Sequence, residues 1–111
     1  MAGNGIADAY VGAVNAGDLE AILALFSPDA VLNNPAGTFT GLDEIRSFYG
    51  SVVLAGKARL TIRSVQAADR RVTAELTATS PLGQAGNELV AVDKFVLDDE
   101  GRIRSLEIVY R

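Results

Sequence analysis

The feature that most constrains this 111-residue chain is a change in the period of its apolar residues near the middle. In the first half these residues recur at spacings of three and four, which predicts amphipathic helices. From residue 59 onward they alternate with polar residues, which predicts half-buried strands. This order predicts an α+β domain, with three N-terminal helices packed on a curved antiparallel sheet and a pocket between the two layers. The expected strands are 30–32, 59–66, 71–79, 87–97 and 102–110.

Several residues mark where the helices should begin and end. The first helix is expected over residues 4–15, and Gly17 suits the left-handed backbone that follows a helix end. Asp18 is the expected cap of a second helix, whose apolar stripe runs to Phe26. A third helix is expected after Thr40, because Thr40-Gly41-Leu42-Asp43 resembles a capping box.

The composition restricts the chemistry that is open to the chain. It has no cysteine, which excludes disulfides and thiolate chemistry, and no histidine, which removes the commonest general base and metal ligand. Acid–base chemistry must then use aspartate, glutamate, tyrosine or the two lysines, Lys57 and Lys94. We expect neither a metal nor any other cofactor.

Length, charge and hydropathy predict a single domain over residues 1–111. The mean hydropathy is +0.21, and no apolar run reaches the roughly 18 residues of a membrane helix. The net charge is −4 and the basic residues are scattered, so a nucleic-acid partner is not expected. Without cysteine or an N-terminal signal pattern, the expected location is cytoplasmic.

Asp93 stands out on physical grounds. The segment 89–97 alternates so that one face carries Asp93 among apolar side chains, and its other face is also largely apolar. Desolvation there would raise the pKa of the carboxyl, and a protonated carboxyl can donate a hydrogen bond. The alternative is an aspartate paired with an arginine or exposed at a sheet edge.

Three further polar residues have both a structural and a functional interpretation. Tyr10 lies on the apolar stripe of the first helix, where a buried hydroxyl needs a partner. Tyr10 and Tyr49 could each be a core tyrosine bonded to a backbone carbonyl. Asn34 precedes Pro35 after a short strand, which is typical of a turn.

Together these residues resemble the bacterial ketosteroid isomerases, also called steroid delta-isomerases, of the NTF2-like and SnoaL-like superfamily. The similarity extends from about residue 10 to residue 109. The run Asn15-Ala16-Gly17-Asp18-Leu19 is common in the wider superfamily and indicates its cone-shaped fold. Phe48-Tyr49 and Val92-Asp93-Lys94-Phe95 match more specific segments of the isomerases.

The resemblance implies an activity and a set of roles. Ketosteroid isomerases convert a β,γ-unsaturated 3-ketosteroid to the α,β-unsaturated ketone through a dienolate, which an oxyanion hole stabilises. Tyr10 and a protonated Asp93 stand at the two oxyanion positions, as in the general case of a carboxyl kept neutral by an apolar site. Tyr49 stands where a supporting tyrosine bonds the first one. Phe26, Phe48 and Phe95 are candidate substrate contacts.

Asn34 departs from the isomerase pattern. The base of these enzymes is an aspartate directly before the proline, and here Asn34 occupies that position. A carboxamide has no useful basicity, so turnover is expected to fall on the order of 10²- to 10⁴-fold or more. Asn34 is either a laboratory replacement of aspartate or the mark of a natural relative with lost or changed activity. Phenolic steroids that resemble the dienolate are expected to bind at least as tightly as to an aspartate form.

Other functions of the same fold remain open. A SnoaL-like polyketide cyclase would often use a histidine, and an enzyme like limonene epoxide hydrolase would need carboxylates with an arginine, for which Arg63 and Glu75 are weak candidates. A binding or dimerisation module without catalysis is favoured by Asn34. Apolar residues on the outer sheet face, such as Val90, Val92 and Val96, predict a homodimer.

The end of the chain bears on the far wall of the expected pocket. Isomerases often continue beyond the last strand with a segment that helps wall this pocket. Tyr110 is expected to take part of its place.

Overall fold

The fold is described from a computed structural model for residues 2–53, 59–79 and 88–111. Its helices and strands follow one another in the order expected from the periodicity, with the helices in the first half. The helical segments are α1 (Ala2–Ala16), α2 (Leu19–Ala24), α3 (Gly41–Phe48) and the π-helical η1 (Tyr49–Val53). The strands are β1 (Phe26–Asn34), β2 (Gly37–Thr40), β3 (Arg59–Ala68), β4 (Arg71–Thr79), β5 (Leu89–Leu97) and β6 (Ile103–Tyr110).

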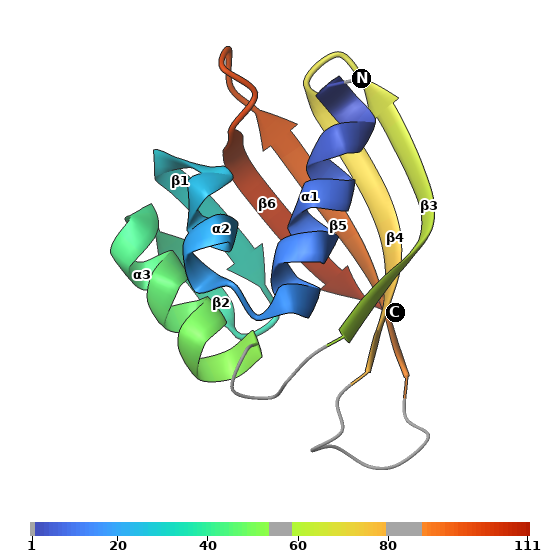
Figure 1. Cartoon of the computed structure of the whole chain (residues 1–111), viewed down its shortest axis with the longest axis horizontal. Helices are drawn as coiled ribbons and strands as arrows, with labels where there is room; N and C mark the ends of the chain where they lie inside the picture. Colours follow the sequence, from blue (N-terminus) through green and yellow to red (C-terminus); the bar gives the residue numbers. More distant parts are fainter. Residues whose placement is uncertain (1, 54–58, 80–87) are drawn as a thin grey trace.

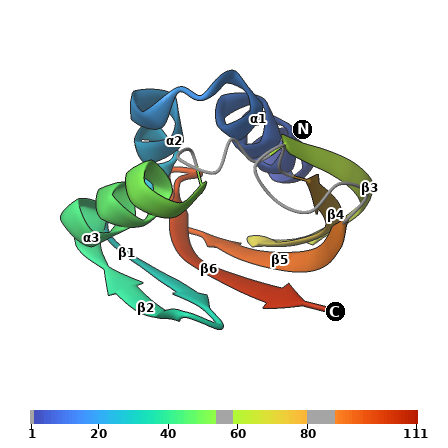
Figure 2. The ribbon, with the colours of Figure 1, turned by 90° about the horizontal axis from the view of Figure 1, so that it is seen from below.

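The strands form one six-stranded sheet in the order β2-β1-β6-β5-β4-β3 (Figure 1). The sheet curves, and all three helices lie on its concave side (Figure 2). The predicted α+β class and the two-layer arrangement are therefore confirmed. Residue 87, at the expected start of the third long strand, lies outside the described residues.

The sheet is mixed, whereas the sequence pattern predicted an antiparallel one. β1 runs parallel to β6, with Leu32 opposite Leu106, and every other neighbouring pair among the described strands is antiparallel. The antiparallel pairs join strands that are neighbours in sequence, so short connections set their direction. β1 and β6 come from opposite ends of the chain, and no hairpin fixes their relative direction.

The region around Phe26 also differs from the prediction. The second helix ends at Ala24, and Phe26 begins a nine-residue strand instead of completing the helical stripe. The register of β1 against β6 is irregular between Phe26 and Val31. Pro28 lies in that interval and has no backbone N–H for the ladder. The expected strand at 30–32 is therefore only the regular part of β1, and β2 was not predicted.

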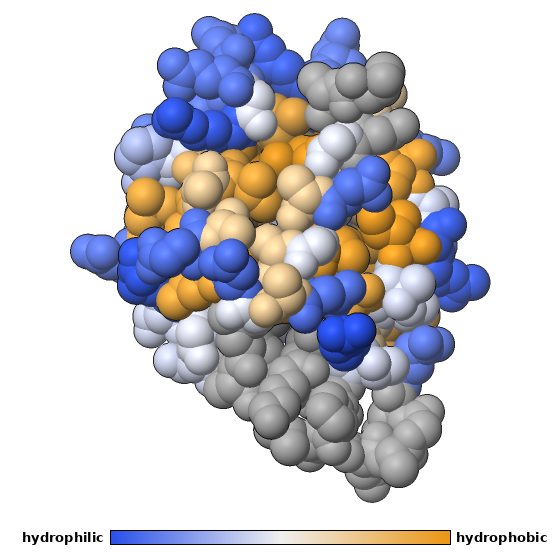
Figure 3. All heavy atoms as spheres, viewed as in Figure 1, coloured by the Kyte–Doolittle hydropathy of each residue, from blue (hydrophilic) through white to orange (hydrophobic). Residues whose placement is uncertain are grey.

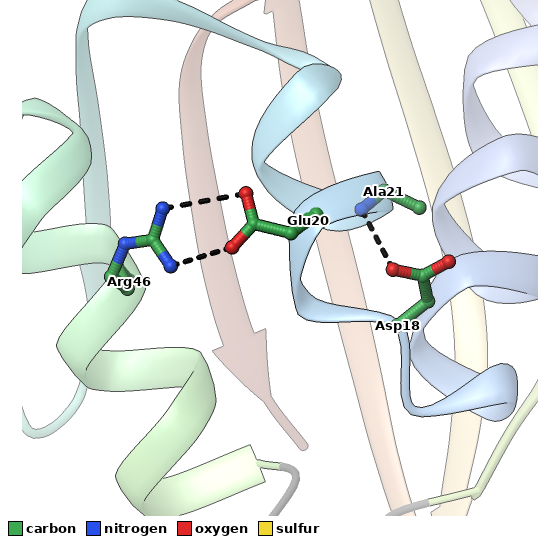
Figure 4. Close-up of polar contacts among 4 residues, drawn as sticks. All are labelled: Asp18, Glu20, Ala21 and Arg46. Carbon is green, nitrogen blue, oxygen red and sulfur yellow. Dashed lines mark hydrogen bonds and ion pairs between the residues drawn. The ribbon is translucent and has the colours of Figure 1, made fainter.

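The connection between α1 and α2 follows the predicted cap chemistry. Gly17 has φ +68°, the left-handed conformation that glycine adopts easily. The Asp18 carboxylate then accepts a hydrogen bond of 3.1 Å from the backbone N–H of Ala21 (Figure 4). Arg46 of α3 contacts Glu20 of α2 at 2.7 Å, which links these two helices on the surface (Figure 4).

The start of α3 satisfies half of the expected capping box. The Thr40 hydroxyl makes no cap hydrogen bond. The backbone N–H of Thr40 instead donates to the Glu44 carboxylate at 2.8 Å, one residue beyond the expected Asp43.

Asn15 joins the end of α1 to the edge strand β3. Its side-chain amide donates to the carbonyl of Leu60 at 2.9 Å, and its side-chain oxygen accepts from the N–H of Leu60 at 2.7 Å. The carboxamide thus pairs both polar groups of one edge residue, as a neighbouring strand would.

The core fills the space between the helices and the concave face of the sheet. Its largest fully buried side chains include Tyr49, Phe95, Ile22, Leu32, Ile45, Leu76, Ile103 and Leu106. On the surface of the helical side, apolar residues gather near the middle and hydrophilic ones lie mainly toward the margin (Figure 3).

Candidate active site

Asp93 lies in the middle of β5 on the face that packs against the helices. Its Cα partners are Ala74 on β4 and Ile108 on β6, so apolar residues flank it on both sides. The residue is 2% exposed. Its Oδ1 atom is buried and has no hydrogen-bond partner among the described residues. A buried polar atom without a partner is costly, and it is a common sign of a site made for a ligand.

Burial alone shifts the ionisation of this carboxyl. Desolvation raises the pKa of Asp93 from 3.8 to about 7, because the charged form is the one that loses most when water is removed. Asp93 is therefore mainly protonated below neutral pH and can then donate a hydrogen bond. The alternative of an arginine-paired or exposed aspartate does not fit this environment.

Tyr10 and Tyr49 form a buried hydroxyl pair. Tyr10 comes from α1 and Tyr49 from the start of η1, and their hydroxyl oxygens are 2.7 Å apart, with either one able to donate. Both residues are at most 3% exposed. Burial raises the pKa of both phenols, and the charge of Asp93 raises them further. Both therefore stay protonated near neutral pH and act as donors or acceptors, not as bases.

Phenylalanines fix the positions of the two tyrosines. The Tyr10 ring meets Phe95 edge-on at 5.4 Å between centroids, and Phe95 follows Asp93 by two residues on the same face of β5. Tyr49 contacts Phe26 at 6.0 Å and Phe48 at 5.0 Å between ring centroids. Such aromatic contacts hold each ring from several directions.

A cavity of about 80 Å³ connects these groups. Its walls are largely apolar, and its polar groups are two tyrosine hydroxyls and one carboxyl. The described residues that line it are Tyr10, Phe48, Leu60, Leu76, Ala78, Ala91, Asp93, Ile108 and Tyr110. A small apolar space with a few converging polar groups suits the carbonyl or phenol end of a hydrophobic ligand.

Tyr110 lies at a more open part of this cavity. It is 44% exposed and pairs with Ala91 across the β5–β6 ladder. Burial raises its pKa first, and the charge of Asp93 adds to this. Its hydroxyl is thus a third group that is electrostatically coupled to Asp93.

Asn34 lies in a different setting at the end of β1. Its side-chain oxygen accepts hydrogen bonds from the backbone N–H groups of Ala36 at 2.8 Å and Gly37 at 3.2 Å, which stabilise the β1–β2 turn. It lines a second, open hollow of about 250 Å³ with Asn33, Pro35, Glu107, Ile108 and Val109. The turn interpretation from the sequence therefore describes its present contacts.

The strand register nevertheless brings Asn34 level with Asp93. Asn33 pairs with Glu107 on the parallel β6, so Asn34 comes one residue later, at the level of Ile108. Ile108 in turn pairs with Asp93 on β5. Two strand spacings are roughly 10 Å, so Asn34 and Asp93 lie in one row across the sheet, with Ile108 between them and contacting both hollows.

The predicted contact residues divide into two groups. Phe48 lines the cavity, whereas Phe26 and Phe95 do not and instead pack against the tyrosines. Glu75 is half-buried and pairs with Arg111 at 2.9 Å, and Arg63 is exposed, so neither belongs to this cavity.

Most of the apolar lining was not singled out from the sequence. Alternation placed Ala91 on the face of Asp93, and the same rule applied to β6 places Ile108 and Tyr110 there. Leu60 and Ala78 depend on how β3 and β4 curve, which no local pattern encodes.

The described residues hold no group of three or more acidic, cysteine or histidine side chains that could bind a metal ion. Within the same part of the chain, no helix combines the length and apolarity required to cross a membrane.

Comparisons with known proteins agree with this architecture. A family model for the SnoaL-like domain matches residues 7–106. The steroid delta-isomerase of Nocardioides simplex is 30% identical over 99 residues, which cover 87% of this chain and 80% of that protein.

Two solved structures show the same fold at low sequence identity. One is a candidate ketosteroid isomerase from Kribbella flavida, with a TM-score of 0.85 and 19% identity, covering 99% of this chain and 78% of the other. The other is a computationally designed 17-OHP binder, with a TM-score of 0.84 and 17% identity, covering 100% and 92%. The chain therefore has the NTF2-like fold that the sequence predicted.

Proposed function

The chain belongs to the SnoaL-like domain family, and from this premise we propose that its cavity binds a hydrophobic ketone, or the matching enol or phenol, in the manner of a ketosteroid isomerase. The single observation that carries the proposal is the buried Asp93 oxygen without a partner among the described residues, on the same cavity as the Tyr10 hydroxyl. A ligand oxygen placed there would accept from both groups. Similarity to a steroid delta-isomerase supports this choice of ligand.

The two donors suit an oxygen that gains negative charge. The Tyr49 hydroxyl can donate to Tyr10, which leaves the Tyr10 proton free to point at the ligand. Protonated Asp93 supplies the second donor. Prearranged donors in an apolar cavity stabilise a dienolate more than its parent ketone, and this difference is what accelerates its formation.

The cavity accommodates only the oxygen-bearing end of a steroid. Its volume of about 80 Å³ is well below the roughly 300–1,000 Å³ of pockets that enclose drug-sized ligands. We propose that the first ring enters this cavity and that the rest of the ligand extends past the exposed Tyr110.

Asn34 limits turnover in this proposal. It occupies the row of Asp93 at a distance that leaves space for a substrate ring between them, which is where a base would be needed. Its amide cannot accept the proton, and its oxygen is bonded to the turn. Isomerisation of a β,γ-unsaturated 3-ketosteroid is therefore expected to be slow in this chain.

The test is a comparison of this chain with Asn34→Asp on a 3-keto-5-ene steroid, followed by the absorbance of the conjugated enone. Asn34→Asp should be faster on the order of 10²- to 10⁴-fold. Asn34→Ala, which has no carboxylate, is the matched control and should stay slow. Inactivity of both this chain and Asn34→Asp would refute the isomerase proposal.

A second candidate function is small-molecule binding without catalysis. Asp93 is the one carboxyl among the described residues that line the cavity, and Asn34 is engaged in its turn. A binding protein would give tight ligand association and no gain in turnover for Asn34→Asp.

We also propose a homodimer through the outer face of the sheet. Val90, Val92 and Val96 are half-buried on this face, and Val109 on the neighbouring β6 is 38% exposed. Apolar surface of this kind is typical of an interface. Sedimentation equilibrium at micromolar concentration should give twice the mass of the chain, and a monomer would contradict the proposal.

A further inference from the structure

The cavity contains one described group that can take up a proton near neutral pH. Tyr10 and Tyr110 have raised pKa values and therefore remain protonated there. Lys94 is exposed and, as the residue after Asp93 in the strand, points to the opposite face. Asp93 is the remaining titratable side chain among the described residues that line the cavity.

The geometry of Asp93 leaves one oxygen unused by the protein. Its Oδ1 is buried without a hydrogen-bond partner in the described part of the chain, and its strand neighbours Ala74 and Ile108 are apolar. An ionised carboxylate in such surroundings is a stronger base than one in water. The Tyr10 hydroxyl lies on the same cavity and can hold a carbonyl oxygen on its own.

We propose that the ionised carboxylate of Asp93 is itself the general base of this chain, and that Tyr10 alone holds the ketone oxygen while it acts. This inference rests on the proposed function and assigns its proton transfer to a residue other than position 34. Asp93 then has two roles, as a hydrogen-bond donor when protonated and as a base when ionised.

The reaction requires no co-reactant. A carboxylate oxygen of Asp93 takes the proton from the carbon between the carbonyl and the double bond, and the C–H electron pair enters the dienolate. The dienolate oxygen accepts a hydrogen bond from Tyr10. Asp93 returns the same proton to the far carbon of the former double bond, which gives the conjugated ketone and restores the carboxylate.

No cation among the described residues around Asp93 assists its ionisation. The titratable groups coupled to it are Tyr10 from α1, Tyr49 from η1 and Tyr110 from β6, all of them neutral near pH 7. The neighbours on β4 and β6 are apolar. The base form therefore accumulates only as the pH rises through about 7.

The experiment measures isomerisation of cyclohex-3-enone, whose single ring matches the small cavity, between pH 5 and 9. The rate of this chain above the uncatalysed rate should rise about tenfold for each pH unit below pH 7 and level off above it. Asp93→Asn should abolish this rate. Glu75→Gln, which alters a half-buried carboxyl on the other face of the sheet, should leave it unchanged.

Asn34→Asp separates this inference from the proposed function. With the carboxylate introduced at position 34 as base, Asp93 serves as the donor, so the rate should no longer rise through pH 7. Asp93→Asn in that background should reduce the rate without abolishing it.

The possible outcomes distinguish the two proposals. The proposed function fails if Asn34→Asp is inactive. The inference alone fails if Asn34→Asp is active while this chain has no rate above the uncatalysed one, a rate that falls with pH, or a rate that survives Asp93→Asn. Retained phenol binding by Asp93→Asn would show that this variant is folded.

Discussion

The two polar regions in the row across the sheet are built on different principles. Asp93 and Tyr10 lie inside the core, where the described neighbouring side chains leave the Asp93 oxygen without a partner. Asn34 lies at a strand end, and its oxygen is fully used by two backbone N–H groups of its own turn. The core region sacrifices stability to keep a polar group available, whereas the turn region uses its polar group for stability. This difference indicates which of the two retains a ligand-directed role.

The largest expected effect concerns the pH dependence of stability. Folded Asp93 keeps its proton up to about pH 7, whereas the unfolded chain releases it near 3.8. Between these values the folded state binds more protons, so the free energy of unfolding should fall as pH rises from 4 to 7 and stay level above. The loss is on the order of 4 kcal/mol.

Urea unfolding of this chain and of Asp93→Asn at pH 4, 5.5 and 8 checks this expectation. Contributions from other carboxyls cancel in the difference between the two proteins. Parallel curves with a constant difference would mean that Asp93 ionises normally in the folded state.

Tyr10→Phe should have the next largest effect, and it is best measured in the Asn34→Asp background where turnover is fast. Removing one donor to a developing oxyanion lowers kcat by about 10²- to 10³-fold. Tyr49→Phe is the matched comparison, because it removes the same atom but acts on the ligand only through Tyr10. Equal losses in both variants would indicate a general disturbance of the aromatic cluster.

Asp93→Leu should stabilise the protein and remove ligand binding together. The substitution replaces a buried atom that has no partner among the described residues by an apolar side chain of similar size. The free energy of unfolding at pH 8 should therefore rise by about 1–3 kcal/mol. Thermal or urea unfolding measures this, with phenol binding as the second readout. A loss of stability would show that Asp93 is well satisfied in the folded protein.

The smallest effect is expected at the turn. Asn34→Ala loses both hydrogen bonds to Ala36 and Gly37 and should cost about 1 kcal/mol of unfolding free energy, measured by urea unfolding. Asn34→Asp keeps an acceptor at the same place and should change stability by less. If Asn34→Ala were neutral, the side chain would be free to serve the site instead of the turn.

Local patterns predicted the regions of this fold that depend on local interactions. Alternation in 89–97 placed Asp93 on the buried face, and Gly17 and Asp18 defined the first two helix boundaries. The parallel pairing of β1 with β6 was missed, because that contact joins distant segments and leaves no local periodicity. Phe26 was placed in a helix, because one apolar residue fits the end of a helical stripe and the start of a strand equally well.

The candidate site was predictable to a similar extent. The hydroxyl pair of Tyr10 and Tyr49 was expected only from the family resemblance, since no spacing rule connects residues 39 positions apart. The turn contacts of Asn34 followed from the Asn-Pro signal. That Asn34 and Asp93 share a row required the registers of three strands, which only the structure supplies.

The most direct test of the proposed oxygen site is the ultraviolet spectrum and affinity of a phenolic steroid such as estradiol at pH 6, bound to this chain, to Tyr10→Phe and to Asp93→Leu. We predict tight binding to this chain with a red-shifted phenol absorbance, and loss of both in each variant. Equal affinity and an unshifted spectrum in all three proteins would show that the cavity binds its ligand by apolar contact alone, and that Tyr10 and Asp93 do not form a site for its oxygen.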